Sequence, residues 1–227
     1  MRALTIFFFS LFSLPLVLNA QSVDEMLQKV SAAIESGQHG QAVSYFRQTS
    51  GFNIDRTEMF YWTSIDKSSE ISSKLAVELA SAYRRNRNYD KAYLFYKELL
   101  QKTPDNVDYL EACADMQVCR GHEKEALRMY EKVLQLDTDN LAANIFLGNY
   151  YYLMAEKEKK RLDTDFKKLA SPTKMQYARY RDGLSKVFST DYQKARNSLR
   201  KVISQFPSTE AQKTLDKILR IEKEVNR

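Results

Sequence analysis

Apolar side chains recur every three or four residues along most of the chain, which is the spacing of amphipathic α-helices. Between residues 73 and 102 the pattern is interrupted once, by a polar stretch at 87–90. It ends before Pro104, because proline cannot continue a helix and disfavours helical backbone in the residue before it. The stretch therefore predicts two antiparallel helices joined by a short turn.

The sequence pattern of this helix pair occurs twice, with a period of 34 residues, and continues into a third copy. The positions that repeat are apolar or small: Leu79, Cys113 and Leu147; Ala80, Ala114 and Gly148; Ala92 and Ala126; Tyr96 and Tyr130; Leu100 and Leu134. Small residues at fixed positions let two antiparallel helices approach closely. A period of this length is typical of a stacked repeat array, because one helix pair cannot bury its apolar face alone.

The repeated unit resembles the tetratricopeptide repeat (TPR), whose pattern has Leu and a small residue, then Tyr, Ala, an aromatic residue and Pro. The matching positions are Leu79, Ala80, Tyr83, Ala92, Tyr96 and Pro104, then Cys113, Ala114, Ala126 and Tyr130. In the second copy Gln117 replaces the Tyr and Thr138 replaces the Pro. The resemblance implies an all-α, TPR-like helical-repeat solenoid, a right-handed superhelix of antiparallel helix pairs with a C-terminal capping helix. An unrelated helical bundle with a chance period is the alternative.

Residues 21–227 are expected to form one solenoid domain. Its expected parts are a divergent repeat at 23–50, a connecting segment at 51–68, repeats at 73–106 and 107–140, an extended repeat-like region at 141–207, and a capping helix at 208–225. The connecting segment holds an aromatic cluster at 59–62, for which we predict a short helix near 56–65 that packs against the stack. The cluster as a ligand platform is the alternative. Ser68 or Ser69 is expected to cap the helix that follows.

The turn expected in the third copy is missing, because Lys160 stands where the repeat would place Ala and apolar spacing continues through Phe166. We therefore predict one long helix at about 141–169, with a degenerate second helix from 156 as the alternative. Ser171 and Pro172 have the chemistry of a helix start. A turn at 189–192 and a helix ending at Pro207 would complete the last repeat-like pair.

Residues 1–20 have the features of a secretory signal peptide, with Arg2 followed by an apolar run that ends before a polar segment. Cleavage after Ala20 would export the protein to the periplasm or out of the cell, and an uncleaved membrane anchor is the alternative. Cys113 and Cys119 lie six residues apart on one predicted helix, on different faces, and are poorly placed to bond to each other. We expect both to be buried apolar residues, and a metal site or an intermolecular disulfide is the alternative.

The sequence contains few of the residue patterns that carry catalysis. The only two histidines, His39 and His122, fall at separate predicted turns. There is no Gly-rich phosphate loop, no HExxH motif and no nucleophile elbow. We therefore expect no catalytic residues, no cofactor and no metal site.

Basic residues are concentrated toward the C-terminus. Residues 156–227 carry 19 basic and 10 acidic residues, against 15 basic and 19 acidic in residues 21–155. One interpretation is a solvated basic face, and another is contact with an acidic partner or an anionic envelope surface. Nucleic acid is not expected, because a signal peptide would direct the protein away from it.

The resemblance also implies where a partner binds. In TPR proteins a concave surface made by the first helix of each repeat commonly binds an extended or helical segment of another protein. The matching positions here are Lys74, Ser81, Arg84 and Arg85, then Asp108, Glu111, Asp115 and Val118, then Asn149 and Tyr152. A carboxylate clamp is not expected, because only Asn149 fits its pattern, whereas Val77 and Glu111 stand where Lys or Asn is required.

The expected function is a non-catalytic protein–protein interaction scaffold or adaptor of the bacterial cell envelope, monomeric because both ends of the array resemble caps. The groove residues expected to contact the partner are Lys74, Arg84, Arg85, Glu111, Asp115, Asn149 and Tyr152. A structural, self-associating component is one alternative, and an envelope hydrolase is another.

Overall fold

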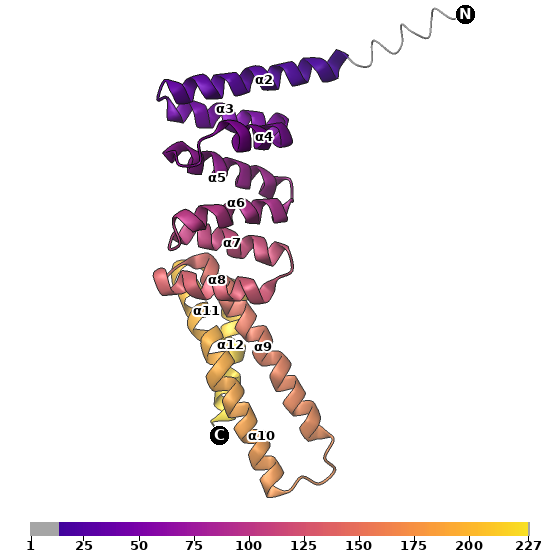
Figure 1. Cartoon of the computed structure of the whole chain (residues 1–227). Helices are drawn as coiled ribbons and strands as arrows, with labels where there is room; N and C mark the ends of the chain where they lie inside the picture. Colours follow the sequence, from indigo (N-terminus) through magenta and orange to yellow (C-terminus); the bar gives the residue numbers. More distant parts are fainter. Residues whose placement is uncertain (1–13, 227) are drawn as a thin grey trace, which may run out of the picture. The chain divides into compact units, whose positions relative to one another are not determined.

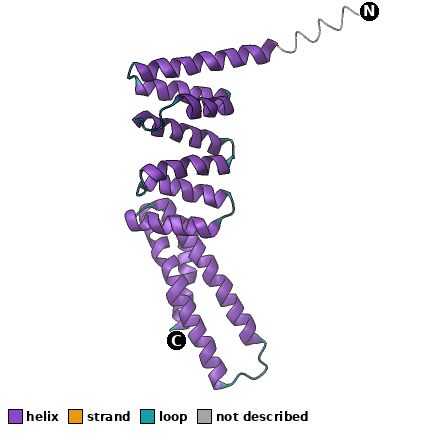
Figure 2. Ribbon diagram, in the orientation of Figure 1, coloured by secondary structure: helices purple, strands orange, loops and turns teal. Residues whose placement is uncertain are grey.

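A computed structural model of the protein describes residues 14–226, and every regular element within that range is a helix (Figures 1 and 2). The predicted all-α fold is confirmed for this part of the chain. The chain forms two compact units, one ending at His122 and the other beginning at Glu123. Of the predicted signal peptide at 1–20, residues 1–13 lie outside the described range. None of the described helices combines the length and the apolar character needed to cross a membrane.

The first unit is built from stacked helix pairs. Its helices are α2 (Leu14–Glu35), α3 (His39–Phe52), α4 (Ile54–Ser64), α5 (Glu70–Arg85), α6 (Tyr89–Lys102) and α7 (Val107–Cys119). The pairs α2–α3 and α5–α6 pack on each other through α3 and α5, and α7 packs on α6. The short helix predicted near 56–65 is confirmed as α4, which packs against α3 and α5.

Asparagine side chains cap the N-termini of three helices in the first unit. Asn53, Asn88 and Asn106 each accept a hydrogen bond from the backbone N–H three residues later, at 3.0 to 3.2 Å, which satisfies one of the unpaired donors of a helix start. Ser69 does stand at the N-cap of α5, but its hydroxyl donates to the carbonyl of Asp66 instead. The cap position expected at Ser68 or Ser69 is therefore confirmed at Ser69, although its side chain makes no capping hydrogen bond.

The turns between paired helices share one backbone conformation. Gly37 has φ 71° and Gly121 has φ 76°, which glycine adopts at little cost because it lacks a Cβ. Arg87 lies 34 residues before Gly121 and has φ 58°, so the same turn is formed there by a residue with a side chain. The repeat thus fixes the turn geometry even where the sequence does not supply glycine.

The second unit contains α8 (Glu123–Leu136), α9 (Leu141–Lys167), α10 (Lys174–Val187), a π-helix η1 (Phe188–Tyr192), α11 (Gln193–Gln205) and α12 (Thr209–Val225). The single long helix predicted at 141–169 is confirmed as α9. The final helix predicted at 208–225 is confirmed as α12, with Ser208 as its cap. The start predicted at Ser171 and Pro172 is two residues early, because Thr173 caps α10 in a reciprocal arrangement with Gln176.

The turn predicted at 189–192 is wrong. Those residues form η1, and the backbone is helical at Val187 on one side and at Gln193 on the other. The hydroxyls of Ser189 and Thr190 both donate to the carbonyl of Lys186, so polar side chains that commonly mark a turn bond within the helix here. As a result α10, η1 and α11 follow one another with no loop between them.

This helical run forms a long hairpin with α9 (Figure 1). The first half of α9 packs against α11, where a Cβ on Gly148 would lie 3.0 Å from Leu199 Cδ2. The second half packs against α10, where Gly183 faces Leu162. The alanine that a period of 34 places at residue 160 is found at Ala195, 35 residues later (195 minus 160). The third helix pair therefore consists of the first half of α9 and α11, with an inserted helical arm, residues 156–191.

The two cysteines differ in their surroundings. Cys113 is buried and Cys119 is exposed, and both are free. The expectation that they do not bond to each other is confirmed, whereas the expectation that both are buried is wrong for Cys119. Burial raises the pKa of the Cys113 thiol to about 12, so this side chain behaves as a small apolar residue.

Candidate functional site

Five of the predicted partner-contacting residues come from the first unit, and we call their surface the α5–α7 face. Its members are Lys74, Arg84 and Arg85 on α5, and Glu111 and Asp115 on α7. Arg84 Nη2 lies 3.1 Å from Asp115 Oδ2, so side chains from the first helices of two successive repeats meet on one face. Lys74 instead pairs with Glu70 of its own helix at 2.9 Å.

The electrostatics of the α5–α7 face are those of a solvated surface. The side chains of Arg84 and Asp115 are 50% and 30% exposed, so their ion pair is screened and easily exchanged. Arg85 is also exposed. Such a pair contributes little to folding, and the guanidinium of Arg84 can exchange it for a carboxylate of another molecule.

The other two predicted residues lie in the second unit, on α9. Asn149 is exposed, whereas Tyr152 is half-buried with its ring centroid 6.2 Å from that of Tyr192. Burial, together with the nearby carboxylate of Glu156, raises the pKa of Tyr152. Tyr152 is therefore in part a packing residue at the base of the arm.

The prediction did not include two exposed apolar side chains on α9. Ile145 and Leu153 are exposed and lie four residues before and after Asn149, so the three positions share one helix stripe. In the sequence, Ile145 and Leu153 have the same helical spacing as core residues. Their exposure becomes apparent only once the packing of the neighbouring helices is known.

The aromatic cluster of the connecting segment is divided between core and surface. Tyr61 is fully buried, as the packing interpretation required, but Trp62 is 51% exposed. Trp62 stacks on Phe95 of α6 with ring centroids 5.8 Å apart. Beside them is an apolar hollow of about 320 Å³, which we call the Trp62 pocket; it is lined by Glu58, Trp62, Lys91, Leu94, Phe95 and Glu98.

A charged cluster borders the Trp62 pocket. Lys91 Nζ lies 2.7 Å from Glu58 Oε2 and 3.0 Å from the Tyr83 hydroxyl, and Tyr83 also donates to Glu58. Burial disfavours the charged form of Glu58, but hydrogen bonds from Lys91, Tyr83 and Trp62 outweigh it and hold the pKa of this carboxyl below its usual value. Burial and the contact with Glu58 raise the pKa of Tyr83 to about 12. The cluster is thus fixed as a carboxylate, an ammonium and a neutral phenol.

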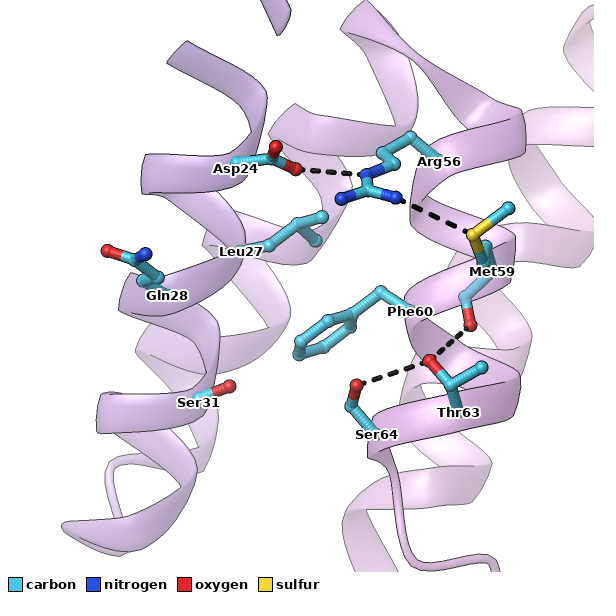
Figure 3. A pocket seen from close by; sticks show the side chains of 9 residues that line it. All are labelled: Asp24, Leu27, Gln28, Ser31, Arg56, Met59, Phe60, Thr63 and Ser64. Atoms are coloured by element: carbon cyan, nitrogen blue, oxygen red, sulfur yellow. Dashed lines mark hydrogen bonds and ion pairs between the residues drawn. The ribbon is translucent and has the colours of Figure 1, made fainter. Parts of the chain in front are cut away.

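A second hollow, of about 350 Å³, lies between α2 and α4 (Figure 3). Leu27 and Phe60 give it an apolar surface, and the ion pair between Arg56 Nε and Asp24 Oδ1, 2.9 Å apart, bridges the two helices at one end. The hydroxyls of Thr63 and Ser64 lie 3.3 Å apart at the other end. The hollow can accept an apolar side chain, but it presents no nucleophile activated by a base.

The described residues contain no grouping that suggests metal chemistry: among residues 14–226, no cluster of three or more His, Cys, Asp or Glu side chains could hold an ion. What the first unit offers instead is a charged face and two hollows with apolar walls. These are features of a surface that recognises another molecule.

Stacked antiparallel helix pairs with small residues at their crossings define a helical-repeat protein. Two segments match family models of the tetratricopeptide repeat, residues 75–107 and residues 177–209. A crystal structure of a "putative protein binding protein" from Bacteroides ovatus ATCC 8483 is 83% identical in sequence, over 89% of this chain and 98% of that chain, with a TM-score of 0.82. The chain belongs to the tetratricopeptide repeat family.

A more distant solved structure is also similar. It is a tetratricopeptide repeat protein from Parabacteroides merdae ATCC 43184, 16% identical over 89% of this chain and 74% of that chain, with a TM-score of 0.40. Among proteins with curated descriptions, none matches this chain.

Proposed function

We propose that this protein is a non-catalytic protein–protein interaction scaffold or adaptor of the bacterial cell envelope. Family membership supports an interaction role, and the name of the Bacteroides ovatus relative refers to protein binding. The envelope location rests on the signal-peptide pattern at 1–20. The partner that fits is an extended or helical protein segment that carries charges of both signs.

The observation that carries this proposal is the exposed ion pair between Arg84 and Asp115. It joins the first helices of two repeats, yet both side chains lie outside the core, which in α5, α6 and α7 is mainly apolar. A partner carboxylate can replace Asp115 at the planar guanidinium of Arg84, which offers several donors at once. A partner ammonium can in turn bind the released Asp115.

The Trp62 pocket favours an apolar anchor in the same partner or in a second one. Half-exposed aromatic side chains beside a hollow are common sites of strong contact in interfaces. Trp62 and Leu94 leave apolar surface uncovered there, and Glu58 with Glu98 would favour a basic residue next to the anchor.

The basic region 156–227 supplies a second contact, with an acidic partner or an anionic envelope surface. The protein is proposed to act as a monomer, and light scattering of the purified protein is the measurement for this point. A dimer mass that does not change with dilution would favour the alternative of a self-associating component.

Affinity capture from solubilised envelopes tests the scaffold proposal. The bait with Arg84→Glu and Arg85→Glu should lose partners that the wild type retains. A matched bait with Lys29→Glu and Lys97→Glu, which are exposed positions on α2 and α6, should retain them. Equal recovery by all three baits would reject the α5–α7 face. Turnover of ester, glycoside or peptide substrates by the purified protein would overturn the non-catalytic assignment.

A further inference from the structure

Basic and acidic residues are unevenly distributed along the arm. Its shaft, residues 156–165 and 180–191, has six basic and six acidic residues. Its tip, residues 166–179, has four basic residues and no acidic residue. The arm is therefore neutral along its length and has a charge of +4 confined to 14 residues at its end.

The balanced charges of the shaft hold the hairpin together. Lys159 Nζ lies 2.7 Å from Asp163 Oδ2, and the Tyr180 hydroxyl donates to the other oxygen of that carboxylate at 2.6 Å. At the base, Tyr192 donates a hydrogen bond to Glu156. The carboxylates of the arm thus lie in its shaft, and one of them, Asp165, pairs with Lys168 of the tip at 3.0 Å. This pair is exposed, so lipid phosphates can compete for Lys168.

The tip also exposes apolar side chains. Met175 is 65% exposed, Tyr177 is 53% exposed and Leu169 is 37% exposed. Phe166 differs from them, because it turns inward and stacks on Tyr180 with ring centroids 4.4 Å apart. One aromatic residue is therefore enough to close the end of the hairpin, and three further apolar side chains remain in contact with solvent.

The tip projects beyond the rest of its unit. Helix α12 ends beside the arm, where Arg181 donates hydrogen bonds to the carbonyls of Glu224 and Val225. Within the described part of the second unit, α9 and α10 then continue to the loop at 168–173 with each other as neighbours (Figure 1). Tyr177 makes an edge contact with Phe166, with ring centroids 6.0 Å apart, yet Leu169, Met175 and Tyr177 all remain exposed.

We propose that the tip docks onto the surface of an anionic phospholipid bilayer. Its four basic residues would lie among the phosphate groups, where each Lys or Arg strengthens binding by about 1 kcal/mol, or about fivefold. Leu169 and Met175 would enter the boundary between headgroups and acyl chains. Tyr177 suits the same boundary, because its ring is apolar and its hydroxyl is polar.

Charge together with exposed apolar side chains favours a bilayer over an acidic protein. The basic residues, Lys167, Lys168, Lys174 and Arg179, are all exposed and come from both helices and the connecting loop. They lie close in sequence to Leu169, Met175 and Tyr177, so positive charge and exposed apolar side chains occur together at this end of the arm. A fluid surface of many phosphates can meet such an end from any side.

The inference deepens the proposed contact of region 156–227 with an anionic surface, and its place in the cell rests on the proposed export. Vesicle binding by the purified protein tests it separately. The protein should sediment with vesicles of phosphatidylcholine and phosphatidylglycerol, and not with vesicles of phosphatidylcholine alone. Higher salt should weaken the binding, because it screens the charges.

Two variants with the same net charge separate the tip from the rest of the protein. A tip variant, with Lys167, Lys168, Lys174 and Arg179 all changed to Gln, should bind at least about tenfold more weakly. A control variant, with Lys157, Lys160, Lys213 and Lys217 all changed to Gln, should bind almost as well as the wild type. Equal losses in the two variants would overturn the proposal in favour of binding by net charge.

A fluorescent residue at the tip tests insertion directly. In a Trp62→Phe background, which removes the only tryptophan, Tyr177→Trp places an indole at the tip. Its emission should shift to shorter wavelength when anionic vesicles are added, and that of a matched Leu153→Trp variant should not. An absent shift at residue 177 would overturn the proposal, as would a tip variant that binds vesicles normally but loses an acidic protein in envelope capture. Loss of capture by Arg84→Glu and Arg85→Glu alone would bear only on the scaffold proposal.

Discussion

Gly148 of α9 lies against Leu199 of α11, so closely that an added Cβ would be 3.0 Å from the Leu199 side chain. The two residues are 51 positions apart, whereas the corresponding helices of a 34-residue repeat are separated only by a short turn. Their contact shows that α11 packs against the first half of α9, with the arm lying between these two segments in the sequence. It also identifies the position where that repeat is most sensitive to side-chain size.

We expect Gly148→Leu to destabilise the second unit by on the order of 1–3 kcal/mol, because a well-packed crossing cannot take additional methylene groups without moving. Gly148→Ala should be nearly neutral, since the better helix propensity of alanine, about 1 kcal/mol, offsets a small shift of Leu199. Urea denaturation followed by circular dichroism measures both.

The double variant Gly148→Leu with Leu199→Ala is the control for this contact. Removing the Leu199 side chain creates the space that the new leucine needs, so the two changes together should cost less than their sum. Strict additivity would show that residues 148 and 199 do not compete for the same space.

The arm should be removable. Replacing residues 154–191 by Arg-Gly-His, the turn found at 120–122 between α7 and α8, joins the first half of α9 to α11 in the repeat's own register. The shortened protein should remain helical and unfold cooperatively, because Gly148, Leu199 and the ion pair between Arg196 and Glu222 at 2.6 Å all remain. Loss of cooperative unfolding would mean that the arm is required for the fold of its unit.

The sequence predicted the repeat where the period is intact, and where it is interrupted it predicted α9 and α12 but not the continuation of α10 into α11. Helices α5 and α6 were predicted from residues 73–102, because the small and aromatic residues there recur at the same positions of the 34-residue unit. The arm was misread because Leu162 and Tyr180 pack within it at ordinary helical spacing, which does not identify the helix they face. The residues at 189–191 are of types common in turns, so the sequence did not reveal the π-helix at 188–192.

The candidate site was predictable to a similar degree. Arg84 and Asp115 could be placed together because the repeat assigns their positions to the same side of successive helices. The exposure of Trp62 could not, because an aromatic residue on a short helix is buried or uncovered according to neighbours that are distant in sequence. The same reason applies to Ile145 and Leu153.

The shared turn conformation predicts two opposite effects. Arg87→Gly should stabilise the first unit by about 0.5–1 kcal/mol, since glycine adopts a positive φ without steric cost. Gly121→Ala should destabilise it by a similar amount or more, although a Cβ there would meet no other atom within 4 Å. The fluorescence of Trp62, the only tryptophan, reports the unfolding of this unit in urea. Changes of the same sign in both variants would contradict a common turn geometry.

The contact of Lys91 with Glu58 predicts how the first unit responds to acid. The ordinary pKa of a glutamate carboxyl is 4.5, and in the folded protein that of Glu58 is lower. As the pH falls below about 4.5, the unfolded chain takes up a proton at this position before the folded protein does. Stability contributed by Glu58 is therefore present above that pH and is lost as the pH falls through the lowered pKa.

Glu58→Gln should remove this part of the acid dependence and cost on the order of 1–2 kcal/mol at neutral pH, the range for a hydrogen bond to a charged group. Lys91→Met should also destabilise the first unit at neutral pH, because burial of Glu58 would then be offset only by the hydrogen bonds from Tyr83 and Trp62. The variants must be compared by urea denaturation at neutral pH and at several values below 4.5, with circular dichroism as the signal because Trp62 itself donates to Glu58 at 3.3 Å. The double variant should cost less than the two single changes added together, since both remove the same interaction. If Glu58→Gln lost stability in acid as steeply as the wild type, other carboxyl groups would have to account for the acid dependence.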